Sequence, residues 1–188
     1  MKISYNWLKE FVKIDKSAEE IAELLTLSGA EVESVIKHGN DYILDIDITP
    51  NRGDELSVLG IAREVVALTN QPIKNLKLKI KNSNIDLPLT IEIIDSQACP
   101  RFTCRVIDKI KIKSSPKWIV DRLESYGFRT INNIVDITNL VMIELGQPLH
   151  AFDYDKISGH KMIIRRAKNG ERVKTLDGVE RILGNNTI

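Results

Sequence analysis

Residues 41–68 read DYILDIDITPNRGDELSVLGIAREVVAL, and they contain the two periodicities that decide the fold. In the first ten residues apolar and polar side chains alternate, which places Leu44 and Ile46 on one face of a predicted strand and Asp45 on the other. The rest predicts a turn into an amphipathic helix, for which Asp54 is the predicted N-cap. A strand, a corner and a helix in direct succession are typical of a mixed α+β fold.

The corner between strand and helix has the sequence TPNRGD, residues 49–54. It places Arg52 just before a helix, where a basic side chain and free backbone N–H groups can bind phosphate. However, it lacks the glycines of a phosphate-binding loop. We therefore interpret it as a structural corner held by Pro50, Asn51 and Asp54.

The residues before this corner predict two more helices and a strand. In SYNWLKEFV, residues 4–12, the apolar side chains recur at helical spacing. In the next helix Ser17 and Glu20 have the spacing of a capping box, and Gly29 stands where a helix ends in the left-handed conformation. EVESVIK, residues 31–37, alternates and predicts a strand.

Residues 70–88, NQPIKNLKLKIKNSNIDLP, are rich in asparagine, lysine and proline and predict a domain boundary. Beyond it we expect strands at LTIEII (89–94), RFTCRVIDKIKI (101–112) and KMIIRRA (161–167), a hairpin turning at Asp177-Gly178, a helix capped by Ser115 and ended by Gly127, and a short helix from Asn139 to Leu145. The predicted fold class is therefore α+β, with a small helix/strand module at 1–80 and the first part of a mixed α/β domain at 85–188.

Composition narrows the class of protein. The chain has 188 residues, of which 43% are hydrophobic and 28% charged, with a net charge of +1. No run approaches the roughly 18 apolar residues of a membrane helix, and the first residues lack the apolar segment of a secretory signal. We expect a cytoplasmic protein without a membrane partner. Cys99 and Cys104 are expected to be reduced thiols, because no second Cys/His pair accompanies them.

The charge is distributed unevenly. Residues 1–100 contain 11 Lys/Arg and 16 Asp/Glu, so the remaining residues are basic. A basic half is compatible with a polyanion that binds the C-terminal part, and also with packing of the two halves on each other.

Polar residues frame the apolar helix predicted in DITNLVMIELGQPLHAFD, residues 136–153. Thr138 is predicted at the helix start, beside Asn139. There its hydroxyl either caps its own helix or, together with backbone N–H groups, holds an oxyanion or a water molecule.

His150 follows the helix in a loop, where it is either a structural hydrogen-bonding group or a base. A metal site formed with Asp153 and His160 is disfavoured by the ligand spacing. Arg129 either pairs with a carboxylate or phosphate, or is an ordinary surface arginine.

The order of several segments resembles one family. WLKEFV, LTLSGAEVESV, DIDITPNRGDELSVLGIAREVVAL, ACPRFTCRV, GFRTINNIVDITNLVMIELGQPLHAFD and KTLDGVERIL, taken together, resemble the beta subunit of bacterial phenylalanyl-tRNA synthetase. The resemblance spans the whole chain and is most specific from Gly127 to Asp153. It differs from the typical subunit in two respects. The OB-fold tRNA-binding module is absent near Gly39-Asn40, and the sequence stops within the editing domain, so a fragment of a longer polypeptide is expected.

The resemblance implies a function and a site. It implies that this chain is part of a phenylalanine–tRNA ligase, with an incomplete pocket that hydrolyses tyrosine wrongly attached to tRNA(Phe). Thr138 and His150 then position water or the ester, and Arg129 and Asn139 contact the substrate. The implied partners are the alpha subunit, in an alpha2beta2 assembly, and the 3′ end of tRNA(Phe). ATP and Mg²⁺ are implied for the whole enzyme and no cofactor for this part. The alternatives are a free-standing aminoacyl-tRNA deacylase and a non-catalytic tRNA-binding or scaffold module.

Overall fold

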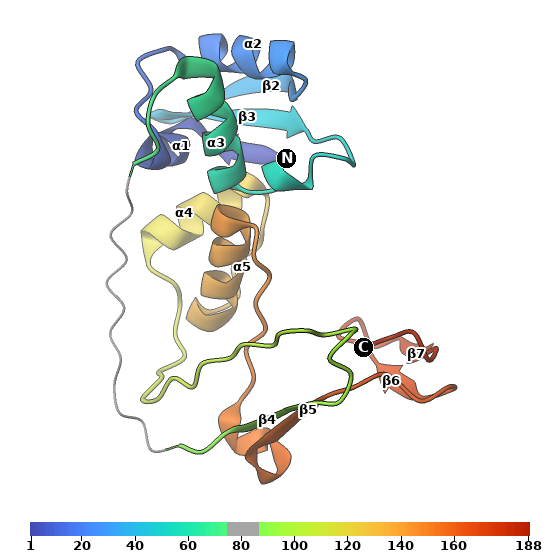
Figure 1. Cartoon of the computed structure of the whole chain (residues 1–188). Coiled ribbons are helices and arrows are strands. Elements are labelled where there is room, and N and C mark those ends of the chain that lie inside the picture. Colours follow the sequence, from blue (N-terminus) through green and yellow to red (C-terminus); the bar gives the residue numbers. More distant parts are fainter. Residues whose placement is uncertain (75–86) are drawn as a thin grey trace. The chain divides into compact units, whose positions relative to one another are not determined.

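The computed structural model describes residues 1–74 and 87–188, and it has an α+β architecture (Figure 1). The chain divides into two compact units. Unit 1 comprises Met1–Ile80 and Lys111–Ala151, and unit 2 comprises Lys81–Ile110 and Phe152–Ile188. Among the described residues, no helix is long and apolar enough to cross a membrane.

The division into these two units does not coincide with the domain boundary that the sequence predicts. The division into 1–80 and 85–188 remains a prediction about sequence domains, and its centre, residues 75–86, lies outside the described residues. In the structure, helices α4 (Lys117–Tyr126) and α5 (Asn133–Leu145) belong to unit 1. They do so because Ile119, Leu123, Leu140 and Ile143 are buried in the same core as the N-terminal side chains.

Unit 1 contains a three-stranded antiparallel sheet of order β1-β3-β2. Its strands are β1 (Lys2–Ser4), β2 (Glu31–His38) and β3 (Asp41–Asp47). The two strands predicted from alternation, β2 and β3, are confirmed. They pair from Glu31 opposite Asp47 to His38 opposite Asp41, with an irregularity between Val32 and Ser34.

Two helices of unit 1 follow their sequence signals closely. Helix α1 (Tyr5–Phe11) is capped by Ser4, and helix α2 (Ala18–Ser28) begins with the predicted capping box of Ser17 and Glu20. Gly29 ends α2 with a φ of 106°, a left-handed conformation that favours glycine. Both helices and the predicted end at Gly29 are therefore confirmed.

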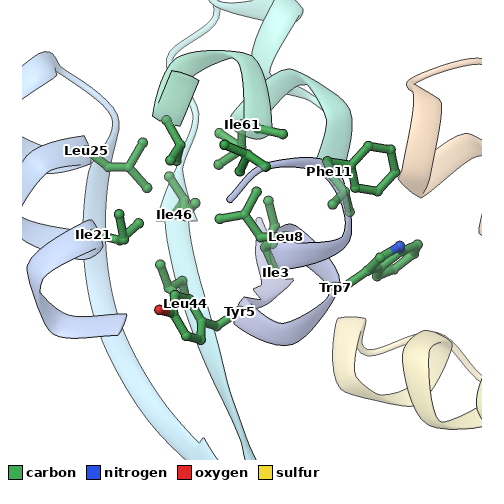
Figure 2. Close-up of a cluster of buried hydrophobic side chains, with 14 of the residues drawn as sticks. Ile3, Tyr5, Trp7, Leu8, Phe11, Ile21, Leu25, Leu44, Ile46 and Ile61 are labelled. Carbon is green, nitrogen blue, oxygen red and sulfur yellow. The ribbon is translucent and has the colours of Figure 1, made fainter. Parts of the chain in front are cut away.

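Figure 2 shows the core that these elements share. Side chains from β1, α1, α2, β3 and helix α3 (Val58–Thr69) meet there. Among them are Ile3, Trp7, Leu8, Phe11, Ile21, Leu25, Leu44, Ile46 and Ile61, all of which are buried. Burial of each large apolar side chain contributes about 1.5–3 kcal/mol relative to exposure, so this core supplies most of the driving force for folding of unit 1.

The helix after the TPNRGD corner starts later than the sequence predicts. Helix α3 spans Val58–Thr69, and its N-cap is Ser57, whose Oγ accepts a hydrogen bond from the Gly60 N–H at 2.9 Å. The prediction of Asp54 as the cap is wrong, because Asp54 lies in a separate 3₁₀ turn, Gly53–Glu55, and its carboxylate binds Arg52.

Unit 2 consists of small elements. Strand β4 (Thr90–Ile93) pairs with β5 (Lys161–Ile164) in parallel, and β6 (Arg172–Lys174) pairs with β7 (Glu180–Ile182) in the predicted hairpin. Two 3₁₀ turns, Tyr154–Lys156 and Ser158–His160, precede β5. The prediction of a strand at residues 101–112 is wrong, because this segment pairs with no strand among the described residues and is almost entirely exposed.

Candidate functional site

Helix α5 is the element that positions the predicted site residues. It begins at Asn133, six residues before the predicted start. The Asn132 Oδ1 caps it by accepting hydrogen bonds from the N–H groups of Ile134 at 3.0 Å and Val135 at 3.1 Å. The prediction that the helix starts at Asn139 is therefore wrong, although the predicted end at Gly146, with a φ of 73°, is confirmed.

Thr138 consequently lies inside the helix. Its hydroxyl donates to the Val135 carbonyl oxygen at 2.7 Å, the usual arrangement for a threonine within a helix. Backbone N–H groups at this depth donate to carbonyls one turn earlier, so they are not available for an oxyanion. The Thr138 oxygen keeps its capacity to accept a hydrogen bond. Asn139 is the next residue, and both side chains are partly exposed.

Arg129 lies in the loop between α4 and α5 and is exposed. The loop starts at Gly127, where the Phe128 N–H donates to the Leu123 carbonyl oxygen at 2.8 Å. It is fastened further along by Asp136, which is 1% exposed. The Asp136 carboxylate accepts hydrogen bonds from the Ile131 N–H at 2.8 Å and from the Ser115 hydroxyl at 2.5 Å.

Asp136 was not predicted as a functional or structural residue, although a sequence signal exists. An acidic residue in the first turn of a helix, between apolar neighbours, has backbone N–H groups within reach. The prediction that Ser115 caps α4 is wrong. The Ser115 hydroxyl donates a hydrogen bond to Asp136, and Pro116 occupies the N-cap position of α4.

His150 lies five residues beyond the last residue of α5 and is exposed. Helix α5 has 13 residues, which corresponds to a length of about 20 Å. The structure therefore arranges the predicted residues along one helix, with Arg129 before its start, Thr138 and Asn139 within it and His150 after its end. It does not gather them at one point.

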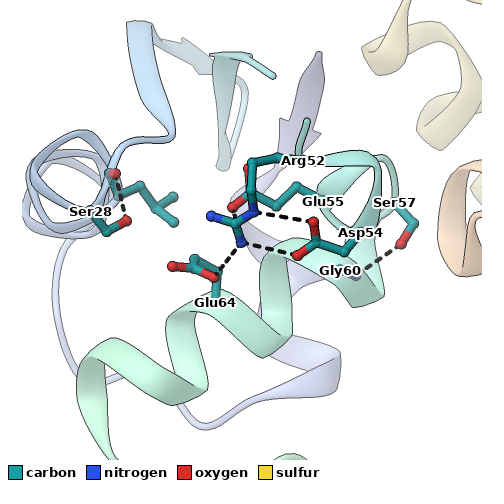
Figure 3. A network of polar contacts seen from close by, with 8 residues as sticks. Ser28, Arg52, Asp54, Glu55, Ser57, Gly60 and Glu64 are labelled. Carbon is teal, nitrogen blue, oxygen red and sulfur yellow. Dashed lines mark hydrogen bonds and ion pairs between the residues drawn. The ribbon is translucent and has the colours of Figure 1, made fainter. Parts of the chain in front are cut away.

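The TPNRGD corner forms a compact ionic network (Figure 3). Arg52 donates to Asp54 through Nε at 3.1 Å and Nη2 at 3.0 Å, and to Glu64 through Nη2 at 3.0 Å. The same Nη2 lies 2.5 Å from the Glu55 Oε1. Arg52 is thus engaged within the chain. Of the three residues expected to hold the corner, Asp54 takes part in this network.

Glu55 and Glu64 are the members of this network that the sequence did not reveal. Glu55 is 1% exposed, and burial raises the pKa of its carboxyl above the ordinary value of 4.5 against the opposing effect of Arg52. Hydrogen bonds with Arg52 lower the pKa of Asp54. The arginine therefore stabilises charged carboxylates at the surface and one carboxyl group in the interior.

Two surface hollows of the described residues are not lined by Arg129, Thr138, Asn139 or His150. A hollow of about 510 Å³ is lined by Ile94, Asp95, Ser96, Gln97, Arg165, Arg166 and Lys168, and another of about 160 Å³ by Lys2, Ile36, His38, Ile43, Asp45, Glu124 and Ser125. Residues 1–74 and 87–188 contain no group of three or more His, Cys, Asp or Glu that could hold a metal ion. His160, one of the disfavoured metal ligands, stacks on the ring of Tyr154 at 4.2 Å.

Comparison with known proteins gives a consistent family. Residues 98–188 match the model of the B3/4 domain. The phenylalanine–tRNA ligase beta subunit of Carboxydothermus hydrogenoformans is 48% identical over 155 residues, which cover 82% of this chain and 19% of that protein. The beta subunit of Rhodopirellula baltica is 38% identical over 179 residues, which cover 94% of this chain and 26% of that protein.

A solved structure is similar at low identity. It is an N-terminal fragment of the phenylalanyl-tRNA synthetase beta subunit from Pyrococcus horikoshii, with 18% identity, a TM-score of 0.42, and coverage of 97% of this chain and 50% of that one. The chain spans about a fifth to a quarter of the length of these curated relatives. The sequence matches nevertheless extend over most of its own residues, and the chain belongs to the family of the phenylalanine–tRNA ligase beta subunits.

Proposed function

We propose that this chain is part of the beta subunit of a phenylalanine–tRNA ligase and contributes helix α5 and its two flanks to a pocket that hydrolyses tyrosyl-tRNA(Phe). The observation that supports the proposal is that Thr138 and Asn139 lie on a well-anchored helix, with Arg129 and His150 in the loops that flank it, all within the segment that matches the B3/4 domain. A rigid helix is a better support for the two central residues than a loop.

The chemistry required is the hydrolysis of an ester. Phenylalanine and tyrosine differ by one hydroxyl group. The apolar pocket in which phenylalanine is activated cannot strongly reject an amino acid that only adds a hydroxyl, so a second site that recognises this hydroxyl is needed. In our proposal His150 takes a proton from the attacking water or positions it, and the Thr138 oxygen accepts a hydrogen bond from another part of the bound substrate. Positioning of this kind can account for much of the rate without a catalytic triad.

Arg129 and Asn139 are proposed to contact the substrate. The exposed guanidinium of Arg129 is suited to a phosphate of the tRNA 3′ end, because it presents several N–H donors in a fixed plane. Asn139 can donate and accept hydrogen bonds with the terminal adenosine. An acidic group that accepts a hydrogen bond from the tyrosine hydroxyl would complete this pocket.

Charging of tRNA(Phe) with phenylalanine is proposed for the complex with the alpha subunit, in an alpha2beta2 assembly in the cytoplasm. ATP and Mg²⁺ serve that reaction. The residues described here do not fit these groups: Arg52 is engaged by three carboxylates, and no cluster of metal ligands is found in 1–74 and 87–188. We therefore assign no step of the ligation to this part of the protein.

The test uses the complete subunit purified with its partner, carrying His150→Ala or Thr138→Ala. We expect hydrolysis of tyrosyl-tRNA(Phe) to fall by about 100-fold or more for His150→Ala, as when a general base is removed, and less for Thr138→Ala. Charging with phenylalanine should be unchanged. Hydrolysis at the normal rate in both variants contradicts the proposal and favours a non-catalytic module. Hydrolysis by the 188-residue chain alone favours a free-standing deacylase.

A further inference from the structure

The C-terminal end of α5, from which the His150 segment leaves, is held by side chains of the N-terminal module. Trp7 of α1 is 2% exposed, and its indole N–H donates a hydrogen bond to the Glu144 Oε2 at 2.9 Å. Glu144 lies in the last turn of α5. A buried indole has little rotational freedom, so this contact fixes the last turn of α5 relative to α1.

Arg122 of α4 reinforces the same contact. Its guanidinium carbon lies 4.8 Å from the centre of the Trp7 ring and 5.1 Å from that of Trp118. The guanidinium forms an ion pair with Glu10 of α1 and approaches Glu144 to 3.9 Å. Interactions of a cation with aromatic faces are strongest when the groups are partly removed from water, as Arg122 is here.

Gly146, directly after α5, makes a third contact that fixes the end of this helix. Its φ of 73° is left-handed, and a Cβ atom at this position would lie 3.4 Å from the Ser57 Cβ and 3.6 Å from the Leu56 carbonyl oxygen. Ser57 and Leu56 connect the Arg52 corner to α3. Gly146, where the segment to His150 begins, thus lies against the residues that directly follow the TPNRGD corner.

We infer that Trp7, Arg122, Glu144 and Gly146, which we name the α5 clamp, position the His150 segment for hydrolysis of the mischarged tRNA. The inference rests on the proposed function. It gives the N-terminal module a role in the reaction: the clamp sets the direction in which Gln147 to His150 leave the helix. Trp7 and Glu144 are positioning residues, since they act through α5 and not on the substrate.

A role in stability alone must be separated from a role in positioning. The informative variant is Trp7→Phe, which keeps a buried aromatic ring but removes the N–H donor to Glu144. Glu144→Gln is the conservative partner, because the amide oxygen can still accept this hydrogen bond. Glu144→Ala removes the acceptor from a partly exposed position and serves if Trp7→Phe folds poorly. Leu27→Ala is the control, because Leu27 is 79% exposed and lies on α2, outside the clamp.

These variants are made in the complete subunit, purified with its partner, and assayed for hydrolysis of tyrosyl-tRNA(Phe). For Trp7→Phe and Glu144→Ala we expect kcat to fall by about 10- to 100-fold, the cost of a small misplacement of a catalytic group. The KM and the rate of charging with phenylalanine should stay within about twofold, and Glu144→Gln and Leu27→Ala should behave as the unmodified protein. A loss of stability alone would instead lower the active fraction in both reactions.

Normal hydrolysis by both Trp7→Phe and Glu144→Ala overturns the clamp, while a loss in His150→Ala still supports the proposed function. Loss of hydrolysis in Glu144→Gln equal to that in Glu144→Ala also overturns it, because the charge and not the hydrogen bond would then matter. If His150→Ala hydrolyses normally, the clamp has no catalytic group to position and the inference fails, whereas the proposed function fails only if Thr138→Ala also hydrolyses normally.

Discussion

Unit 1 and unit 2 differ in how far their apolar side chains are buried. In unit 1, side chains from five helices and the three-stranded sheet meet in a buried core. In unit 2, none of the described residues is buried, and Ile94, Ile107, Phe152, Leu176 and Ile182 are each more than half exposed. Both units contain strands, and in the part of the chain that the structure describes the strands of unit 1 have helices packed on them.

A sequence pattern that correctly predicts strands does not by itself make a unit stable. The pairs β4–β5 and β6–β7 are two-stranded, and an isolated two-stranded sheet is at best marginally stable in water. Unit 1 combines caps, periodicity and a shared core, so each level of structure supports the others. We expect the stability of the chain to reside in unit 1, including α4 and α5.

The largest expected effect comes from a core truncation. Leu8→Ala removes a fully buried side chain of unit 1 and should lower the free energy of unfolding by about 2–5 kcal/mol. Leu176→Ala in unit 2 is the control and should change it by less than about 0.5 kcal/mol, because Leu176 is fully exposed. Urea unfolding followed by tryptophan fluorescence measures both, and equal effects would contradict the contrast between the units.

A second prediction concerns the tie between α5 and the Arg129 loop. Asp136→Ala leaves the Ile131 N–H and the Ser115 hydroxyl without their acceptor, at a cost of about 1–3 kcal/mol. Asp136→Asn keeps an oxygen acceptor and should cost clearly less. The same unfolding experiment compares the two variants, and similar losses would show that the charge of Asp136, not its hydrogen bonds, holds the loop.

A third prediction compares two helix ends within unit 1. Gly127 and Gly146 end α4 and α5 with positive φ, so alanine at either position costs about 1–2 kcal/mol for the left-handed conformation. A Cβ at Gly127 meets nothing within 4 Å, whereas one at Gly146 contacts Ser57. A contact at van der Waals distance adds no strain, so Gly146→Ala and Gly127→Ala should destabilise to a similar degree in thermal unfolding. A clearly larger loss for Gly146→Ala would contradict this prediction and indicate that Ser57 leaves no room for a Cβ atom.

The smallest expected effect is a pH dependence in the Arg52 corner. Burial raises the pKa of Glu55, so the folded protein binds its proton more readily than the unfolded chain. The contribution of Glu55 to stability is therefore fully present below the ordinary value of 4.5 and is lost as pH rises through the higher pKa of the folded state. Glu55→Gln should flatten the pH dependence of stability in this window. A curve parallel to that of the unmodified protein would contradict this assignment.

The sequence predicted most elements of unit 1 because their signals are local. The capping box of Ser17 and Glu20, the alternation in β3 and the glycine at position 29 each act within a few residues. The start of α5 was missed because its first turns contain Ile134, Val135 and Ile137, and β-branched residues have weak helix propensity. The Asn132 cap and the buried Asp136 stabilise a helix there that propensity alone does not indicate.

The candidate site was predictable only in part. The sequence indicated which polar residues flank an apolar helix, but the misplaced start put Thr138 at a helix end instead of inside the helix. The contact of Trp7 with Glu144 joins residues 137 positions apart, and no local pattern announces such a pair. The strand predicted at 101–112 failed for the opposite reason, since alternation indicates a strand but does not supply a partner for it.

The most direct test of the central claim, that α5 is held by the N-terminal module, is hydrogen exchange of the 188-residue chain followed by mass spectrometry. We predict that peptides covering 133–145 are protected as strongly as those of β3 and α3, while peptides from 87–110 and 152–188 exchange much faster. Trp7→Phe should reduce protection at the C-terminal end of α5 first. Fast exchange of 133–145, at the rate of the unit 2 peptides, would contradict the account.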